Sequence, residues 1–266
     1  MTSIGSVLGR HRNNATLSIV VMLFGVALLA CGVLLFVVRD RVAPEAAQTL
    51  QWTMLGLVLV GALVAVLGWA IRRGGWEQGE LGVRRLPERG DGTFLYRDIV
   101  ETCQFYRSGI SVNLGWRRDG QAQWHSANGH LGGYYKFLDR FMHGYLQARV
   151  PVLLAQIDAG QSANFRMVTT AAAIRREFSV NMKGFTRGPT ETVQVSRERI
   201  AFAGNDIRID DIVGMDVSAW TSRLQFQLRG GSKVGVSYTA LFDGPLLLAL
   251  LQRLLPAQPL PQPSAV

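Results

Sequence analysis

The chain of 266 residues is 48% hydrophobic and only 18% charged, which is too apolar for an ordinary soluble enzyme of this size. Its 28 basic residues outnumber its 19 acidic residues, so the net charge is +9 at pH 7. Intrinsic disorder, a collagen-like repeat and a disulfide scaffold are excluded by this composition. Part of the chain is therefore expected to lie in a membrane.

Two long apolar segments near the N-terminus predict transmembrane helices. Residues 17–38 contain no charge, and residues 50–71 are equally long, so both exceed the roughly 20 residues that cross a bilayer. Trp52 and Trp69 lie near the ends of the second segment, where aromatic anchors are expected. A cleaved signal peptide is the alternative for the first segment, but its apolar stretch is too long and no small-residue cleavage site follows it.

The connection between the two spans is short, so they form a hairpin with both long ends on one side of the membrane. Arginines are more numerous on the side of the termini than in the connection, and the positive-inside rule therefore predicts that both termini are cytoplasmic. We expect a two-pass protein of the bacterial inner (cytoplasmic) membrane. Small residues in the second span would let another helix approach closely, which makes a homo-oligomer one expected partner; these residues are Gly56, Gly61, Ala65 and Gly68.

A short motif is repeated after the spans. Residues 96–100 (YRDIV) are echoed by residues 209–213 (IDDIV), and each copy is followed by a predicted strand pair and then a helix. The predicted strand pairs are 110–116 with 121–125, around Asp119-Gly120, and 224–228 with 233–238, around Gly230-Gly231. The first copy shows no clear strands before Thr93.

The helix that closes the first copy is predicted over residues 134–149, with a continuation over 150–157 past a kink at Pro151. The helix that closes the second copy is predicted over 246–255, where Asp243 is the candidate cap and Pro256 the stop. Further strands are predicted at 164–170, 192–195, 199–203 and 207–209. Residues 171–182 are ambiguous between helix and strand.

Residues 199–212, with the sequence RIAFAGNDIRIDDI, resemble the stretch by which bacterial pleckstrin-homology-like (PH-like) domains are identified. The resemblance implies short antiparallel strands closed by a C-terminal helix. Two spans followed by such domains are similar to a group of uncharacterised bacterial membrane proteins, which have no assigned catalytic residues. The resemblance covers roughly residues 190–256, and more weakly residues 80–150.

The expected fold class is an α+β membrane protein in which a two-helix transmembrane hairpin precedes two tandem PH-like modules. We divide the chain into an N-terminal segment with the hairpin (1–74), a first module (75–160), a second module (161–256) and a proline-rich disordered tail (257–266).

Few residues suggest catalysis. His125 and His130 are close in sequence, but a zinc site needs three or four ligands, and Cys103 has no partner at a useful spacing. A Cys103 nucleophile with His125 as its base is the enzymatic alternative, although a lone cysteine is more often a small buried residue. No cofactor or metal is expected, and no phosphate-binding or nucleophile motif is present in the sequence.

The basic residues suggest contact with a membrane surface. Arginines close to the second span would lie beside the anionic inner leaflet, and those at a predicted hairpin would extend this surface. The candidate residues are Arg72, Arg73, Arg84, Arg85, Arg89, Arg117 and Arg118. Nucleic acid is not an expected partner, because no basic run is interleaved with aromatic residues. The expected function is non-catalytic binding of a protein partner or a lipid headgroup; the alternatives are a membrane-tethered enzyme and an oligomerising component of an inner-membrane complex.

Overall fold

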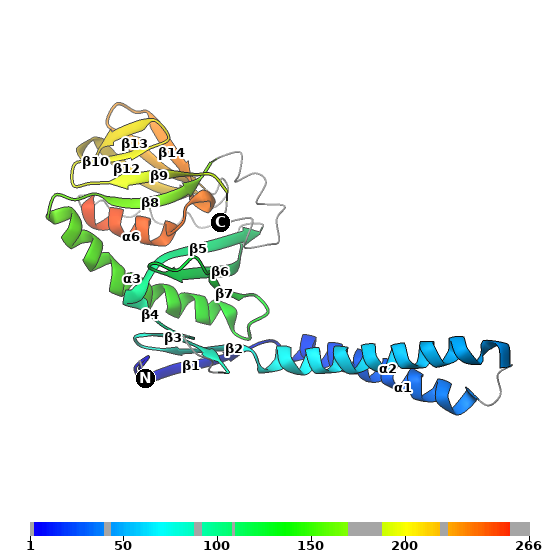
Figure 1. Cartoon of the computed structure of the whole chain (residues 1–266). Helices are drawn as coiled ribbons and strands as arrows, with labels where there is room; N and C mark the ends of the chain where they lie inside the picture. The colour runs from blue at the N-terminus through cyan, green and yellow to red at the C-terminus, as the bar shows by residue number, and fades with distance from the viewer. Residues whose placement is uncertain are drawn as a thin grey trace, which may run out of the picture.

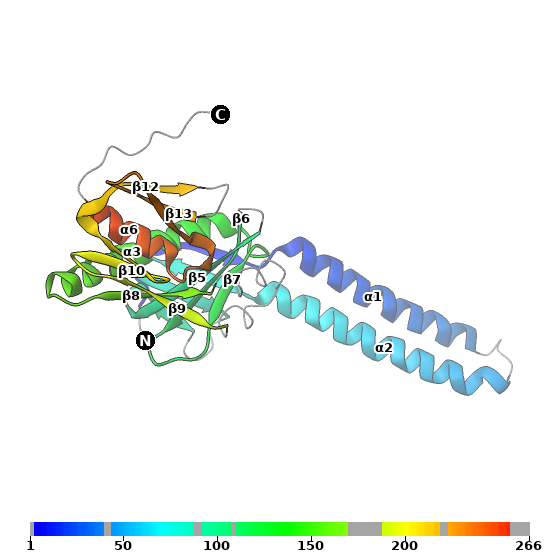
Figure 2. The same cartoon turned by 90° about the horizontal axis from the view of Figure 1, so that it is seen from above.

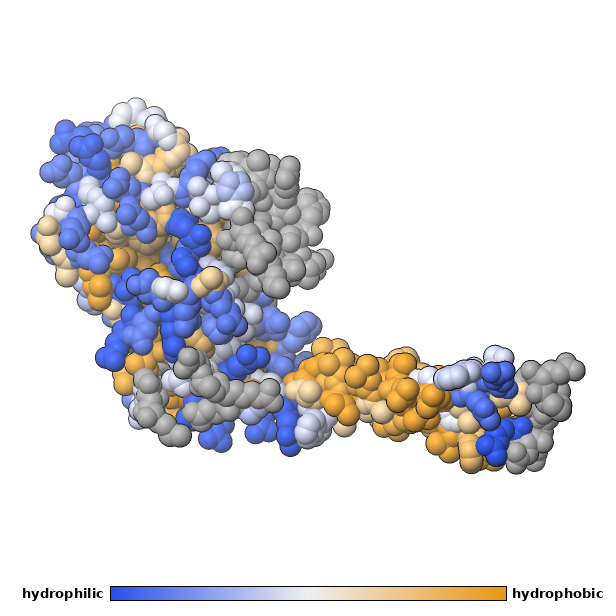
Figure 3. Space-filling model, viewed as in Figure 1, coloured by the Kyte–Doolittle hydropathy of each residue, from blue (hydrophilic) through white to orange (hydrophobic). Residues whose placement is uncertain are grey.

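The computed structural model describes residues 3–39, 44–87, 92–107, 110–169, 188–218 and 223–255. Two apolar helices, α1 (Ala15–Val38) and α2 (Pro44–Arg73), project from the rest of the molecule as an antiparallel hairpin (Figure 1). Both are long and apolar enough to cross a membrane, and only 11% of the apolar window of each is buried. Figure 3 shows that the middle of the hairpin is covered by apolar side chains, whereas the β-rich part presents a mainly polar surface.

Small residues hold α1 and α2 close together. A Cβ atom built on Gly25 would lie 2.5 Å from the backbone nitrogen of Ala65, and one built on Gly61 would lie 2.8 Å from the carbonyl oxygen of Gly25. Gly68 packs in the same way against Met22. The small residues of the second span therefore serve contact within the hairpin, except Gly56, which has no neighbour within 4 Å of a built Cβ atom.

The hairpin is inserted into a sheet. Strand β1 (Val7–Arg12) precedes α1 and pairs antiparallel with β2 (Gly75–Gly79), which follows α2. The sheet is completed by β3 (Gly82–Leu86) and β4 (Thr93–Leu95), in the order β1-β2-β3-β4. The sequence analysis found no leading strands before Thr93, but three are present. One of them lies before the hairpin, in the segment that the sequence analysis separated from the first module.

The rest of this first unit is a second sheet and a helix. A 3₁₀ turn, η2 (Tyr96–Asp98), leads into the sheet β5 (Ile99–Arg107), β6 (Ile110–Arg118) and β7 (His125–Asn128), and α3 (Tyr134–Asp158) follows. The predicted strand at 121–125 is wrong, because the chain between Asp119-Gly120 and His125 forms an irregular loop and pairing starts only at His125. The predicted extension of the helix past Pro151 is confirmed.

The second unit repeats the same order. Its four-stranded sheet is formed by β8 (Ala163–Val168), β9 (Thr190–Val195), β10 (Arg199–Phe202) and β11 (Asn205–Arg208). After η3 (Ile209–Asp211) come β12 (Ile212–Ser218), β13 (Arg223–Leu228), β14 (Lys233–Ser237), η4 (Tyr238–Ala240) and α6 (Gly244–Leu254). The predicted second hairpin and closing helix are confirmed. Residues 171–182 and the tail 257–266 lie outside the described residues.

Details of strand pairing establish the repeat more firmly than the short motif does. The register shifts by one residue at Val100 in β5 and at the corresponding Val213 in β12. Among the described residues, each unit also has one isolated bridge between the end of its first strand, or the residue after it, and the segment just before its closing helix: Asn13–Leu131 in the first unit and Met167–Leu241 in the second. The two units can therefore be compared residue by residue.

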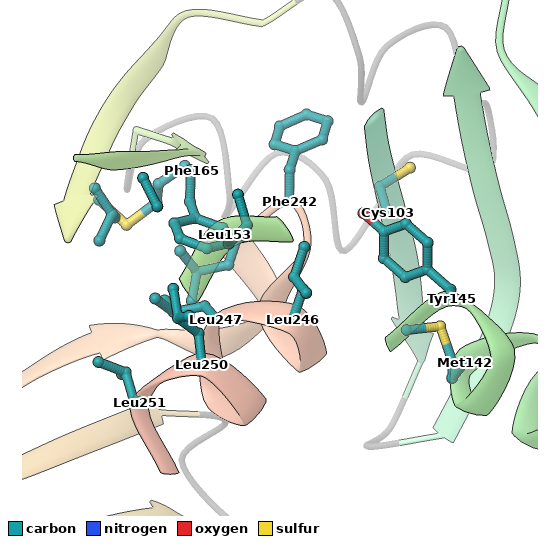
Figure 4. Packing of buried hydrophobic residues seen from close by; sticks show 14 of the residues in the cluster. Cys103, Met142, Tyr145, Leu153, Phe165, Phe242, Leu246, Leu247, Leu250 and Leu251 are labelled. Atoms are coloured by element: carbon teal, nitrogen blue, oxygen red, sulfur yellow. The ribbon is translucent and has the colours of Figure 1, made fainter. Parts of the chain in front are cut away.

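One hydrophobic core runs through both units. The N-terminal half of α3 covers the first unit, where Phe137, Phe141 and Tyr145 are fully buried. Further along α3, Leu153 packs against the second unit. Figure 4 shows Leu246, Leu247 and Leu250 of α6 on the same side as Leu153 and Phe165 of β8, while Tyr145 points toward Cys103 of β5. The long α3 thus joins the two units.

Buried polar groups also link the units. Glu101 of β5 accepts hydrogen bonds from Arg166 of β8, at 2.5 and 2.7 Å, and from Arg117 of β6, at 2.6 Å. Asp243 is the N-cap residue of α6, as the sequence predicted, but its side chain forms no capping hydrogen bond. Its Oδ1 instead accepts hydrogen bonds from the backbone and hydroxyl of Thr102 and from the hydroxyl of Tyr145.

Candidate functional site

A polar cavity of about 310 Å³ lies where the helical hairpin joins the first unit. Its walls come from the end of β1, the start of β2, the end of β3 and strand β7. Asn13 and Gly74, which flank the two helices, line it together with Arg85, His125 and Asn128. Because the chain passes from Arg73 through Gly74 directly into β2, this cavity cannot be far from the end of α2.

The side chains at this end of the first unit form a cluster that we call the basic mouth, consisting of Arg85, Arg118 and His125. The His125 ring lies 4.3 Å from the ring of Phe94, and the Arg118 guanidinium lies 4.5 Å from the same ring. Arg85 lines the cavity with His125 and is close enough to affect its titration. Arg118 and His125 therefore pack on the same aromatic ring, and Arg85 lies near His125.

The electrostatics of the basic mouth favour an anion. Burial lowers the pKa of His125, and the guanidinium groups of Arg85 and Arg118 lower it further. Within the described ranges, no carboxylate forms an ion pair with Arg85 or Arg118, and the buried Nε of Arg118 has no hydrogen-bond partner. An unpartnered buried donor is costly for the fold, and an anion held by the rest of the Arg118 guanidinium would offset part of that cost.

The second unit shows that the fold does not require these charges. Strand registers match each residue of the basic mouth to one position in the second unit. In the order Arg85, Arg118 and His125, the corresponding residues are Phe202, Leu228 and Val234. Phe202 is only 3% exposed and lies 6.0 Å from the Phe226 ring. The same end of the two sheets is thus apolar in the unit without the helical hairpin and basic in the unit that carries it.

Neighbouring arginines in the same strands serve another purpose. Adjacent residues of a strand point to opposite faces, and Arg84 and Arg117 each pair with a buried glutamate, Glu77 and Glu101 respectively. Glu77 is also held by Arg10, and despite its burial these bonds lower the pKa of its carboxyl group. The structure therefore places one member of the Arg84-Arg85 pair and one member of the Arg117-Arg118 pair in the basic mouth.

The remaining predicted residues lie along α2 or outside the described chain. Arg72 and Arg73 are exposed in the last turn of α2, and the Arg73 guanidinium stacks 3.7 Å from the Trp69 ring. Trp52 and Trp69 are 67% and 48% exposed near opposite ends of the apolar part of α2. Arg89 lies outside the described residues.

The groups considered for catalysis are not brought together. Cys103 of β5 pairs with Gly115 of β6, whereas His125 of β7 pairs with the next residue, Trp116. Because successive side chains of a strand alternate, Cys103 and His125 point to opposite faces of the sheet. Cys103 is 1% exposed, whereas His130 is exposed. Among the described residues, no group of three or more histidine, cysteine, aspartate or glutamate side chains could hold a metal ion.

A wider hollow of about 600 Å³ lies on the outer face of the second unit's sheet. Amide and hydroxyl side chains such as Asn164, Thr192 and Gln194 line it, and none of its described lining residues is basic. It therefore lacks the charge and the unpartnered donor that distinguish the basic mouth.

Searches with protein-family models, with curated proteins and with solved structures found no match to this chain.

Sequence reasoning missed two parts of the site. It assigned His125 only to metal binding or catalysis, because the nearby charges of Arg85 and Arg118 come from other strands. It also could not separate Arg85 from Arg84, or Arg118 from Arg117, since that choice depends on strand register. The internal repeat was the available signal, because aligning the two copies would have set these three residues against apolar ones.

Proposed function

We propose that this chain is a membrane-anchored, non-catalytic binding protein in which the basic mouth of the first unit binds the phosphate of an anionic lipid headgroup. The observation that carries the proposal is the replacement of Phe202, Leu228 and Val234 by basic residues in the one unit attached to the hairpin. Arg85 is exposed and Arg118 and His125 are partly buried, whereas Phe202 is buried. Arg85 therefore does not fill the core as Phe202 does, and all three basic groups remain accessible to a ligand.

Membrane insertion of α1 and α2 is part of the same proposal. Trp52 and Trp69 lie about 26 Å apart along α2 at 1.5 Å per residue, which is close to the thickness of the hydrocarbon core. Insertion would place Gly74 and the adjoining cavity at headgroup level. Lipid phosphates would then surround the basic mouth at high local concentration.

The excess of arginines on the side of the termini supports a cytoplasmic location of both units. We propose that the protein resides in the inner (cytoplasmic) membrane, with the PH-like units on its inner face. The PH-like assignment is supported by the order of elements, because each unit is a set of antiparallel strands closed by a final helix.

Exchanging the basic mouth for the residues of the second unit tests the proposal. The variant Arg85→Phe/Arg118→Leu/His125→Val should fold, since the same positions in the second unit hold these residues. Two arginines at a membrane surface contribute about 2 kcal/mol, so the variant should lose roughly thirtyfold in affinity for anionic lipid. Lipid retained by the protein in nanodiscs of mixed phosphatidylcholine and phosphatidylglycerol is measured by native mass spectrometry.

The matched control is Arg197→Gln/Arg208→Gln, which removes two charges from the second unit, where these side chains are 67% and 76% exposed. We expect the control to retain phosphatidylglycerol as the natural chain does. Equal retention by the natural chain and the exchanged variant would refute headgroup binding at this site.

A further inference from the structure

The hairpin between β5 and β6 exposes apolar side chains at its end. Ile110 and Val112 are 54% and 38% exposed, whereas Ser111 between them is only 9% exposed and lies within hydrogen-bond distance of the Tyr134 hydroxyl, at 3.2 Å. The usual arrangement, with apolar residues inside and polar ones outside, is reversed here. Such a reversal suits a surface that faces something other than water.

This hairpin is longer than its counterpart in the second unit. Phe105 and Asn113 correspond to Ser218 and Arg223 by strand register, and the connection between them contains three more residues in the first unit. The additional residues carry Ile110 and Val112 beyond Leu114, the last fully buried apolar residue at this end of β6. The repeat therefore shows that the longer connection is an addition to the fold and not a requirement of it.

Contacts with the rest of the molecule fix the orientation of the β5–β6 hairpin relative to α1 and α2. Tyr106 at its base lies 6.2 Å from Tyr238 of the second unit, ring to ring. Asn13 fixes the helical hairpin to the first unit, because its side chain donates to the Ile71 carbonyl and its backbone amide donates to the Gly74 carbonyl. In both views the connected end of β5 and β6 lies on the side from which α1 and α2 project (Figures 1 and 2).

From this placement we infer that Ile110 and Val112 form a second membrane contact, in which the end of the β5–β6 hairpin rests in the interfacial layer of the bilayer that holds α1 and α2. The inference rests on the proposed membrane insertion but not on headgroup binding by the basic mouth. A rigid body that is fixed to the helices at one point and rests on the lipid at another cannot tilt freely. The two contacts together would set the orientation of both units at the membrane surface.

Single cysteines labelled with an environment-sensitive nitrobenzoxadiazole dye test this contact in nanodiscs of phosphatidylcholine alone. Ile110→Cys and Val112→Cys are made with Cys31→Ala, while buried Cys103 is retained. The matched control is Val213→Cys, 47% exposed near the start of β12, at the end of that strand away from the helices (Figure 2). The natural chain, labelled at exposed Cys31 within α1, reports insertion itself.

We expect the labels at positions 110 and 112 to shift to shorter emission wavelength on reconstitution and to be quenched by lipids that carry a spin label near the headgroup. The label at position 213 should show neither effect. Spin labels deep in the bilayer should quench the label at Cys31, which would confirm insertion of α1. If the labels at positions 110 and 112 are then not quenched, this inference is overturned while membrane insertion stands. Shifted emission without quenching would also overturn it, because it indicates a protein contact instead.

Discussion

At the scale of single residues, the position of a charge in a strand decides what it does. Arg84 and Arg85 are adjacent, as are Arg117 and Arg118, yet one member of each pair neutralises a buried glutamate and the other enters the basic mouth. The difference follows from the alternation of side chains along a strand. Composition alone could indicate a basic surface, but only the pairing of strands shows which arginines reach a buried glutamate in the described part of the chain.

Asp243 is the second residue whose chemistry depends on its distant neighbours. It has a left-handed backbone, with φ of 57°, where the first unit has Gly133. Burial raises the pKa of its carboxyl group to about 7, the nearby Glu101 adds to this effect, and hydrogen bonds from Thr102 and Tyr145 oppose it. The contact between the units therefore holds a fully buried carboxyl group on a residue whose backbone conformation favours glycine.

This residue makes stability depend on pH. Because its pKa in the folded state is raised above the ordinary value of 3.8, its contribution is complete below about pH 4 and is lost as the pH rises through about 7. The loss amounts to at most about 4 kcal/mol, at 1.4 kcal/mol per pKa unit. Asp243→Asn keeps the Oδ1 acceptor but cannot ionise, so its thermal midpoint in nanodiscs should fall less between pH 4 and pH 7.5 than that of the natural chain. Parallel pH profiles of the two proteins would contradict this account.

At the scale of elements, the helical hairpin depends on close backbone contact between α1 and α2. A side chain at Gly25 would meet the backbone of α2, with 2.5 Å between its Cβ atom and the Ala65 nitrogen. Overpacking of this kind costs about 1–3 kcal/mol, so Gly25→Leu should lower the free energy of unfolding of the hairpin in mixed detergent and dodecyl sulfate micelles. The control is Gly56→Leu, which meets no atom and should unfold as the natural chain does. Equal destabilisation by both would show that the helices do not pack through Gly25.

The elements that could be predicted from sequence are those specified by local pattern. The two apolar helices, the second hairpin and the helix after Asp243 follow from length, glycine turns and apolar spacing within a few residues. Strand β1 was missed because VLGRHR carries two arginines, a histidine and a glycine, and because its partner β2 lies beyond the whole helical hairpin. The loop before His125 was misread as a strand because Asp119-Gly120 is also a common turn of a tight hairpin.

At the scale of the whole molecule, two repeated units of one fold have diverged according to their position. The first is interrupted by the helices between β1 and β2, carries the basic mouth beside them and has the longer β5–β6 hairpin. The second has an apolar end and joins the first through Glu101, Arg166 and Asp243. Under the proposed function, the first unit binds lipid headgroups at the membrane surface, and the second unit is held at a constant position relative to the first.

Titration of His125 tests the central claim most directly. Nuclear magnetic resonance of labelled histidine is recorded in nanodiscs of phosphatidylcholine and in nanodiscs that also contain phosphatidylglycerol, with exposed His130 near the same helices as the control for the general surface potential. A phosphate held between Arg85, Arg118 and His125 would favour the charged imidazole. The pKa of His125 should then rise by about one unit more than that of His130 in the anionic nanodiscs. Equal shifts of the two histidines would contradict headgroup binding in the basic mouth.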